Sequence, residues 1–144
     1  MIKFKEPKLE TELKTVHPEL LKLITWVSYW VFNKWQKDVI ITGLGRTRAE
    51  SIALYIHQLN PKTGKLYTPD EVEVSVHEVK PCRGADLRSS EYSHDDCLSL
   101  QYAINTNWIY DTDRIEKKCC KYHSVGKNVF HFHLQCSDKT KLIV

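Results

Sequence analysis

The chain has 144 residues, of which 42% are hydrophobic and 27% are charged, and its formal net charge is +3. These values fit one globular domain with a core of its own. The mild positive charge selects no anionic partner, and the sequence has no arginine-rich run or dense basic stripe, so we expect no nucleic-acid partner.

The N-terminal residues predict a short lead-in before the folded domain. Residues 1–15 are polar and charged and contain no apolar signal core, so we expect the domain to occupy residues 16–144 and the protein to be made in the cytoplasm. The most apolar stretch, residues 20–32, is too short for a membrane span and is interrupted by polar side chains. The five cysteines are odd in number, which favours reduced thiols over a disulfide framework.

The first half of the chain predicts two helices separated by a strand. A helix is expected from His17 to about Lys37, because a proline lies in its first turn and apolar residues recur at helical spacing. Residues 39–42 predict a short buried strand that ends in a glycine-containing turn. A second helix is expected over residues 47–59. Its candidate core residues are Ile52, Leu54, Tyr55, Ile56 and Leu59.

The second half predicts several strands around a third helix. In chain order we expect a strand over 72–76, a strand or strand edge beginning at Asp86–Leu87, a helix over 95–104, a turn at 126–128 and a strand over 129–135. This order of elements predicts an α+β fold, with helices packed on a small antiparallel sheet.

Two histidines on alternate residues, His131 and His133, lie where aromatic and aliphatic residues alternate with polar ones. Because successive side chains of a strand point to opposite faces, both imidazoles are expected on one face. A second cluster upstream contains His77 and Asp86. Two imidazoles and one carboxylate are the ligand set of a catalytic Zn²⁺ that keeps a fourth position for water. The pattern predicts a hydrolytic zinc site, in which one of the paired histidines binds the metal and the other reaches the substrate.

The residues around these candidates resemble the M15-type zinc peptidases, which cleave D-alanyl peptide bonds in peptidoglycan and belong to the lysostaphin, D-Ala-D-Ala peptidase and hedgehog-like group. The resemblance covers roughly residues 16–136 and rests on Ser75-Val76-His77, Arg83-Gly84-Ala85-Asp86 and His131-x-His133. It implies hydrolysis of an amide bond in the stem peptide or cross-link, with bacterial peptidoglycan as the partner. The similarity is greatest to phage endolysins and phage-encoded peptidases.

Carried over position by position, the resemblance implies a Zn²⁺ site formed by His77, Asp86 and His133. It implies that His131 lines the site as a proton donor or transition-state stabiliser. It also implies an arginine that contacts the substrate carbonyl or carboxylate. Arg46 falls at that position, with Arg48 as the alternative.

Two features depart from the family pattern. The interval from His77 to Asp86 is longer, through an apparent insertion within residues 78–82, which a loop can absorb because ligands need only converge in space. Many members also carry an acidic general base shortly before the last zinc histidine, whereas residues 127–130 contain none. Either His131 or His123 takes this role, or catalysis is lost and the chain is a zinc-binding virion or wall-binding protein.

The absence of a signal segment implies synthesis in the host cytoplasm and action at the cell wall after lysis or virion delivery, where phage tail or virion proteins would be further partners. The same residues allow two more interpretations. One is a zinc enzyme that acts on a free D-Ala-D-Ala dipeptide. The other is a binding domain without metal, because a His-x-His pair on a strand is by itself a weak signal.

Overall fold

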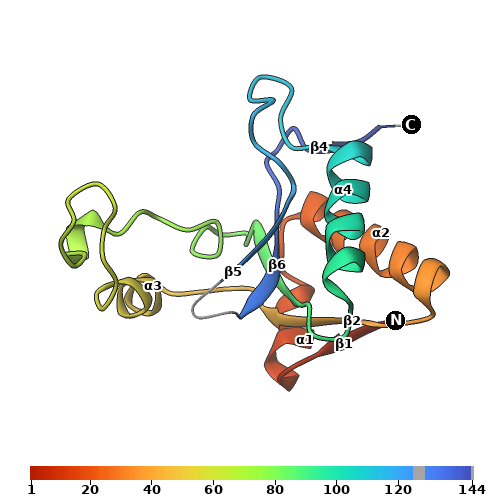
Figure 1. Cartoon of the computed structure of the whole chain (residues 1–144), viewed down its shortest axis with the longest axis horizontal. Coiled ribbons are helices and arrows are strands. Elements are labelled where there is room, and N and C mark those ends of the chain that lie inside the picture. The colour runs from red at the N-terminus through yellow and green to blue at the C-terminus, as the bar shows by residue number, and fades with distance from the viewer. Residues whose placement is uncertain (125–128, 144) are drawn as a thin grey trace.

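The computed structural model describes residues 1–124 and 129–143 and has an α+β fold, as predicted. A five-stranded sheet in the order β1-β2-β3-β6-β5 forms its centre, and a second sheet pairs β4 with β7. Figure 1 shows α2 and α4 on one side of the central sheet and α3 projecting on the other. The elements are β1 (Ile2–Phe4), α1 (Pro7–Leu13), α2 (Pro18–Trp35), β2 (Val39–Gly43), α3 (Arg48–Tyr55), the 3-10 helix η1 (Pro69–Glu71), β3 (Gly84–Arg88), α4 (His94–Asn107), β4 (Trp108–Ile109), β5 (Cys120–Ser124), β6 (Phe130–Gln135) and β7 (Lys141–Leu142).

The central sheet is mixed, which corrects the expectation of an antiparallel sheet. Strands β2, β3, β6 and β5 pair antiparallel, whereas β1 pairs parallel to β2. The expectation that residues 1–15 form a polar lead-in is also wrong. Ile2 and Phe4 lie on the edge strand and pack against the core, and Leu9 of α1 is buried. Two apolar residues in a three-residue strand are too few for a period to be recognised.

Helix α2 begins where the sequence predicts it. The imidazole of His17 accepts a hydrogen bond from the backbone N–H of Glu19, and Pro18 occupies the first helical position. The helix ends at Trp35, and the capping residue Gln36 that follows has a left-handed backbone with φ of 57°. Its apolar face is fully buried and packs against β2 and β6. Burial of this face provides much of the hydrophobic stabilisation of the domain. The buried residues are Leu20, Leu23, Ile24, Val27, Ser28 and Val31.

The two faces of β3 and β6 differ in chemistry because side chains alternate along a strand. Leu87 and Phe132 lie opposite each other in the register and are buried in the core beneath the helices. Asp86 pairs with His133 in the same register, one position along each strand. These two polar side chains, together with His131, therefore lie on the sheet face away from α2 and α4. The predicted strands at Asp86–Leu87 and 129–135 are confirmed.

Residues 47–76 form a lobe that projects from the sheet, and here the sequence predictions are partly wrong. Helix α3 begins with a capping box between Thr47 and Glu50 but ends at Tyr55. Most of the candidate core residues of the predicted helix lie at the lobe surface: Leu54 is 50% and Leu59 is 66% exposed. The lobe is too small to bury both faces of its own helix.

The predicted strand over 72–76 is absent from the described structure, and the segment is a loop. Its backbone carbonyls bind a side chain instead of a neighbouring strand. The guanidinium of Arg48 donates hydrogen bonds to the carbonyl oxygens of Pro69, Val72 and Glu73. Because a buried or half-buried carbonyl needs a donor, the arginine supplies what a strand partner would have supplied.

Three short strands differ from the sequence prediction. Strand β5 begins in the basic segment 117–123, where no strand was predicted, and ends at Ser124. Strands β4 and β7, also not predicted, pair with each other after α4. Helix α4 itself extends beyond the predicted range of 95–104. The turn predicted at 126–128 lies outside the described residues. In the parts of the chain that the structure describes, no helix has the length and apolar character needed to cross a membrane.

Candidate metal centre

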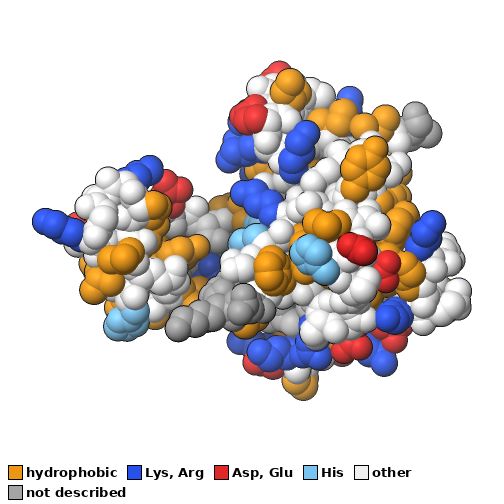
Figure 2. Space-filling view, in the orientation of Figure 1, with side chains coloured by type: hydrophobic (Ala, Val, Ile, Leu, Met, Phe, Trp, Pro, Cys, Tyr) orange, Lys and Arg blue, Asp and Glu red, His pale blue; other side chains and the backbone are white. Residues whose placement is uncertain are grey.

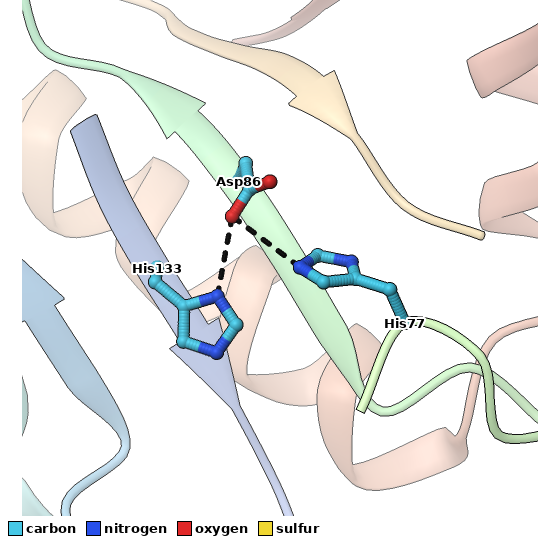
Figure 3. A group of neighbouring side chains, drawn as sticks. All are labelled: His77, Asp86 and His133. Atoms are coloured by element: carbon cyan, nitrogen blue, oxygen red, sulfur yellow. Dashed lines mark hydrogen bonds and ion pairs between the residues drawn. The ribbon is translucent and has the colours of Figure 1, made fainter. Parts of the chain in front are cut away.

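Three side chains from separate segments converge on the open face of the sheet. His77 comes from the loop before β3, Asp86 from β3 and His133 from β6, and one ligand atom of each lies within 4.8 Å of the other two. His77 Nε2 is 3.4 Å from Asp86 Oδ1, and His133 Nδ1 is 3.2 Å from the same oxygen. Figure 3 shows both rings directed at that carboxylate. The structure therefore brings together the three ligands that the sequence predicted.

The strand register and the loop before β3 set this convergence. Asp86 and His133 lie directly opposite each other, so their Cβ atoms are about 4.5–5.5 Å apart on one face. The loop that carries His77 is held at two adjacent residues by backbone hydrogen bonds. The N–H of Arg46 donates to the carbonyl of His77, and the N–H of Arg83 donates to the carbonyl of Val76.

Second partners fix the tautomer of each histidine. His77 Nδ1 lies 2.6 Å from the carbonyl oxygen of Leu44, which can only accept, so Nδ1 carries a hydrogen and, in the neutral ring, the Nε2 lone pair faces Asp86. His133 Nε2 lies 3.3 Å from Gln135 Oε1. The amide of Gln135 is oriented by its Nε2, which donates to the carbonyl of Lys118 at 2.8 Å. In a neutral ring that donates through Nε2 to Gln135, the Nδ1 lone pair of His133 is left to face the centre.

The charges of the cluster are coupled. Burial alone raises the pKa of Asp86, but hydrogen bonds from His133 and His77 and the charge of His77 outweigh it and hold that pKa below its ordinary value. Burial lowers the pKa of His77, but its interactions with Asp86 and Cys82 outweigh this and raise the pKa to about 9. Without a metal ion, a proton on His77 balances the buried carboxylate.

The donor set fits a divalent metal ion. Two imidazole nitrogens and one carboxylate oxygen are common ligands of Zn²⁺, which they bind at about 2.0–2.2 Å. At a tetrahedral angle such ligand atoms lie about 3.3 Å apart. The distances of 3.2 Å and 3.4 Å to Asp86 Oδ1 match that spacing. The hydrogen bonds behind both imidazoles are those that metal-binding histidines usually make.

The predicted catalytic histidines lie beside the centre. His131 Nε2 is 3.7 Å from Asp86 Oδ1 and 3.1 Å from His123 Nε2. Burial lowers the pKa of both His131 and His123 below the ordinary histidine value, and the charge of His133 lowers that of His123 further. Both rings are therefore mainly neutral near pH 7. His123 is exposed to solvent, so the pair leads from the centre to the surface.

The two candidate arginines have different surroundings. Arg46 Nη2 lies 3.9 Å from Asp86 Oδ2, and its side chain is 21% exposed at the centre. Arg48 is bound to the carbonyls of the 69–73 loop and to the carboxylate of Glu78 at 3.5 Å. Arg46 therefore lies at the candidate centre, where its predicted contact with a substrate stays a prediction, whereas Arg48 binds the carbonyls of the lobe.

The centre opens into a cleft of about 1040 Å³ between the lobe and the sheet. Lobe residues, including Tyr55 and Tyr67, line one wall. Lys121 and His123 from β5 and His131 from β6 line the other. Figure 2 shows the lobe on the left set apart from the main body, with basic and histidine side chains at the near edge of the body. The volume is large enough for a peptide segment.

Sequence reasoning missed two residues that shape the centre. Gln135 orients His133 and follows it by two positions, so the period of the strand would have placed it on the same face. Gly84 lies against His77, and a Cβ there would come within 3.3 Å of His77 Cε1. No family model, curated protein or solved structure matches this chain.

Proposed function

We propose that the chain is a zinc-dependent peptidase that hydrolyses an amide bond in the peptidoglycan stem peptide or cross-link, in the manner of a phage endolysin. The observation that carries the proposal is the His77–Asp86–His133 cluster, in which both imidazoles direct a ring nitrogen at one carboxylate oxygen at the base of a cleft. The substrate class rests on the resemblance of the motifs around these ligands to the M15-type peptidases.

A Zn²⁺ held by the three side chains would supply Lewis acidity toward the scissile carbonyl and lower the pKa of a water molecule to about 7. His131, whose Nε2 lies 3.7 Å from Asp86 Oδ1, would accept a proton from the attacking water and return it to the leaving amine. Because the pKa of His131 is lowered, its ring is mainly unprotonated near pH 7 and can accept a proton. His123, 3.1 Å away and exposed, can pass the proton on to solvent.

Arg46 is placed to stabilise negative charge in the transition state. Its guanidinium faces Asp86 from the lobe side of the cleft, 3.9 Å from the oxygen that does not contact the histidines. A guanidinium in that position can donate to a developing oxyanion or bind a terminal carboxylate through two parallel hydrogen bonds.

A second candidate is a catalytically inactive relative that binds zinc and serves in a virion or in wall binding. The observation that favours it is that Asp86 is the only carboxylate in the ligand cluster found among the described residues. If catalysis in this family requires an acidic general base beside the metal ligands, this cluster does not provide one.

The test is the release of new amino groups from purified peptidoglycan by the zinc-loaded protein, with and without a chelator. We expect chelator-sensitive release by the parent. We expect turnover to fall by roughly 100-fold or more in His131→Ala, because a general base contributes that much, while the zinc at the His77–Asp86–His133 centre stays bound. His57→Ala, which alters an exposed histidine of the lobe, is the matched control and should act like the parent. Stoichiometric zinc without release from any wall type would favour the inactive relative.

The two arginines provide a further pair of variants. We predict that Arg46→Ala binds zinc normally but loses roughly 100-fold in rate, the usual cost of one transition-state donor. Arg48→Ala should lower the thermal unfolding temperature, because three carbonyls of the lobe lose their donor. Rates and unfolding temperatures measured side by side check both statements. A loss of rate confined to Arg48→Ala, without a loss of stability, would contradict the assignment.

A further inference from the structure

We infer that His123 and His131 form a second, weaker binding site for a divalent transition-metal ion, at the mouth of the first centre. The two residues lie directly opposite each other in the antiparallel pairing of β5 and β6. Their rings share the cleft face of the sheet, with centroids 4.8 Å apart and planes at 76°. The second site involves neither His77 nor His133.

The geometry of the pair suits a chelated ion. The two Nε2 atoms are 3.1 Å apart, so they cannot both carry a hydrogen in the space between them. Two imidazoles that bind one Zn²⁺ at about 2.0–2.1 Å place their nitrogens about 3.3 Å apart at a tetrahedral angle. An ion can therefore replace the shared hydrogen with a shift of only a few tenths of an ångström in the rings.

The cleft can complete the coordination. Asp86 Oδ1 lies 3.7 Å from His131 Nε2, close enough to be shared between the two sites. Because His123 is exposed and the pair borders an open cleft, water can fill the remaining positions. Imidazole ligands with water favour Cu²⁺, Ni²⁺ and Zn²⁺ over Mg²⁺ and Ca²⁺.

Three features make this site weaker than the first. It offers two histidines of its own instead of two histidines and a dedicated carboxylate. Lys121 lies on the same face of β5 and repels a cation there. An ion already bound at the first centre repels a second one nearby. The sites should therefore fill in order, with the His123–His131 site filling last.

One consequence rests on the proposed function. A metal ion on His131 would occupy the nitrogen that must accept a proton, so excess zinc would slow hydrolysis. Zinc would then be both the cofactor and, at higher concentration, an inhibitor of the same cleft. The binding itself requires no catalytic activity and can be tested alone.

The experiment is equilibrium dialysis of the full chain against increasing free Zn²⁺, with bound zinc measured by elemental analysis. We expect the parent to bind one zinc tightly and a second one weakly. His123→Asn should keep the tight zinc and lose the weak one. His77→Ala should lose the tight zinc and keep the weak one. His57→Asn, at an exposed histidine outside the cleft, controls for nonspecific binding and should match the parent.

The possible failures are distinguishable. If parent and His123→Asn both bind a single tight zinc, the second site is wrong and the proposed function stands. If His123→Asn loses the tight zinc, His123 belongs to the first centre and the inference is overturned. If the parent lacks the tight zinc but loses its weak zinc in His123→Asn, the second site stands and the proposed function fails.

Discussion

At the scale of single residues, the centre depends on hydrogen bonds that determine which nitrogen of each ring faces the metal. Gln135 matters most here, because its amide is tied to the carbonyl of Lys118 and its oxygen is thereby aimed at His133 Nε2. Without that acceptor, the imidazole could rotate or carry its hydrogen on the wrong nitrogen. In the proposed centre, Gln135 would act on the metal through His133.

We predict that Gln135→Ala weakens zinc affinity by about 10-fold to 100-fold, the usual effect of removing a hydrogen-bond partner from a metal-binding histidine. Competition with a chromogenic chelator measures the affinity. Gln101→Ala is the matched control, since Gln101 accepts a 2.6 Å hydrogen bond from the backbone of Tyr122 away from the ligands. Equal affinities in the two variants would show that Gln135 does not orient His133.

The coupled charges of His77 and Asp86 give stability a defined dependence on pH when no metal is bound. The pKa of His77 is raised from 6.5 to about 9 in the folded chain, so its contribution is complete below pH 6.5 and declines as the pH rises toward 9. The pKa of Asp86 is lowered from 3.8, so its contribution is present above that pH and is lost on acidification. Under the proposed function, zinc would replace the proton on His77 and remove the decline at higher pH.

We therefore predict that the zinc-free protein unfolds at a lower temperature at pH 8.5 than at pH 6.0, and that the stabilisation caused by zinc is larger at pH 8.5. Calorimetry of both forms at the two pH values measures this. The range ends at pH 8.5 because the buried thiols, whose pKa values are raised from 9, would add their own decline above it. In zinc-free His77→Gln, the difference in unfolding temperature between pH 6.0 and pH 8.5 should be smaller than in the parent. A zinc-free parent equally stable at both pH values would contradict the coupling.

At the scale of elements, the register of β3 and β6 could be anticipated in part. The alternation around His131 and His133 predicts a strand with both rings on one face, and the structure confirms it. Strand β5 carries His123 opposite His131, but its five residues follow a loop and lack a clear alternation of polar and apolar residues. The loop before β3 could not be derived from the sequence either, because an arginine side chain satisfies its carbonyls. The convergence of His77 on β3 was expected from the zinc ligand chemistry of the histidines and Asp86 and from the family resemblance, not from any strand pattern around His77.

Gly84, the first residue of β3, allows the His77 loop to lie close to the sheet. A Cβ at this position would lie 2.5 Å from Val76 Cγ2 and 3.3 Å from His77 Cε1. We predict that Gly84→Ala destabilises the fold by about 1–3 kcal/mol, as overpacking does, and displaces His77 so that zinc affinity falls. Gly45→Ala is the control, because a Cβ there meets no atom within 4 Å. Chemical unfolding and zinc titration of both variants test this, and unchanged zinc binding in Gly84→Ala would count against it.

At the scale of the whole molecule, one face of the central sheet is packed against helices and the other face borders the open cleft. Helices α2 and α4 bury one face of the sheet, and the lobe of residues 47–76 stands over the other (Figure 1). The shape of the lobe could not be predicted from the sequence. The apolar residues at helical spacing predicted a buried helix face, whereas residues such as Leu54 and Leu59 are exposed. The cleft between lobe and sheet is nevertheless where every predicted ligand and catalytic side chain is found.

The central claim is that this cleft is built around a metal ion held by His77, Asp86 and His133. The most direct measurement is the metal content of the purified full chain, prepared without chelator or affinity tag, compared with that of His133→Ala. We predict about one tightly bound zinc per chain in the parent and none in His133→Ala, with the fold retained. A parent without bound metal, or a variant that keeps it, would contradict the claim.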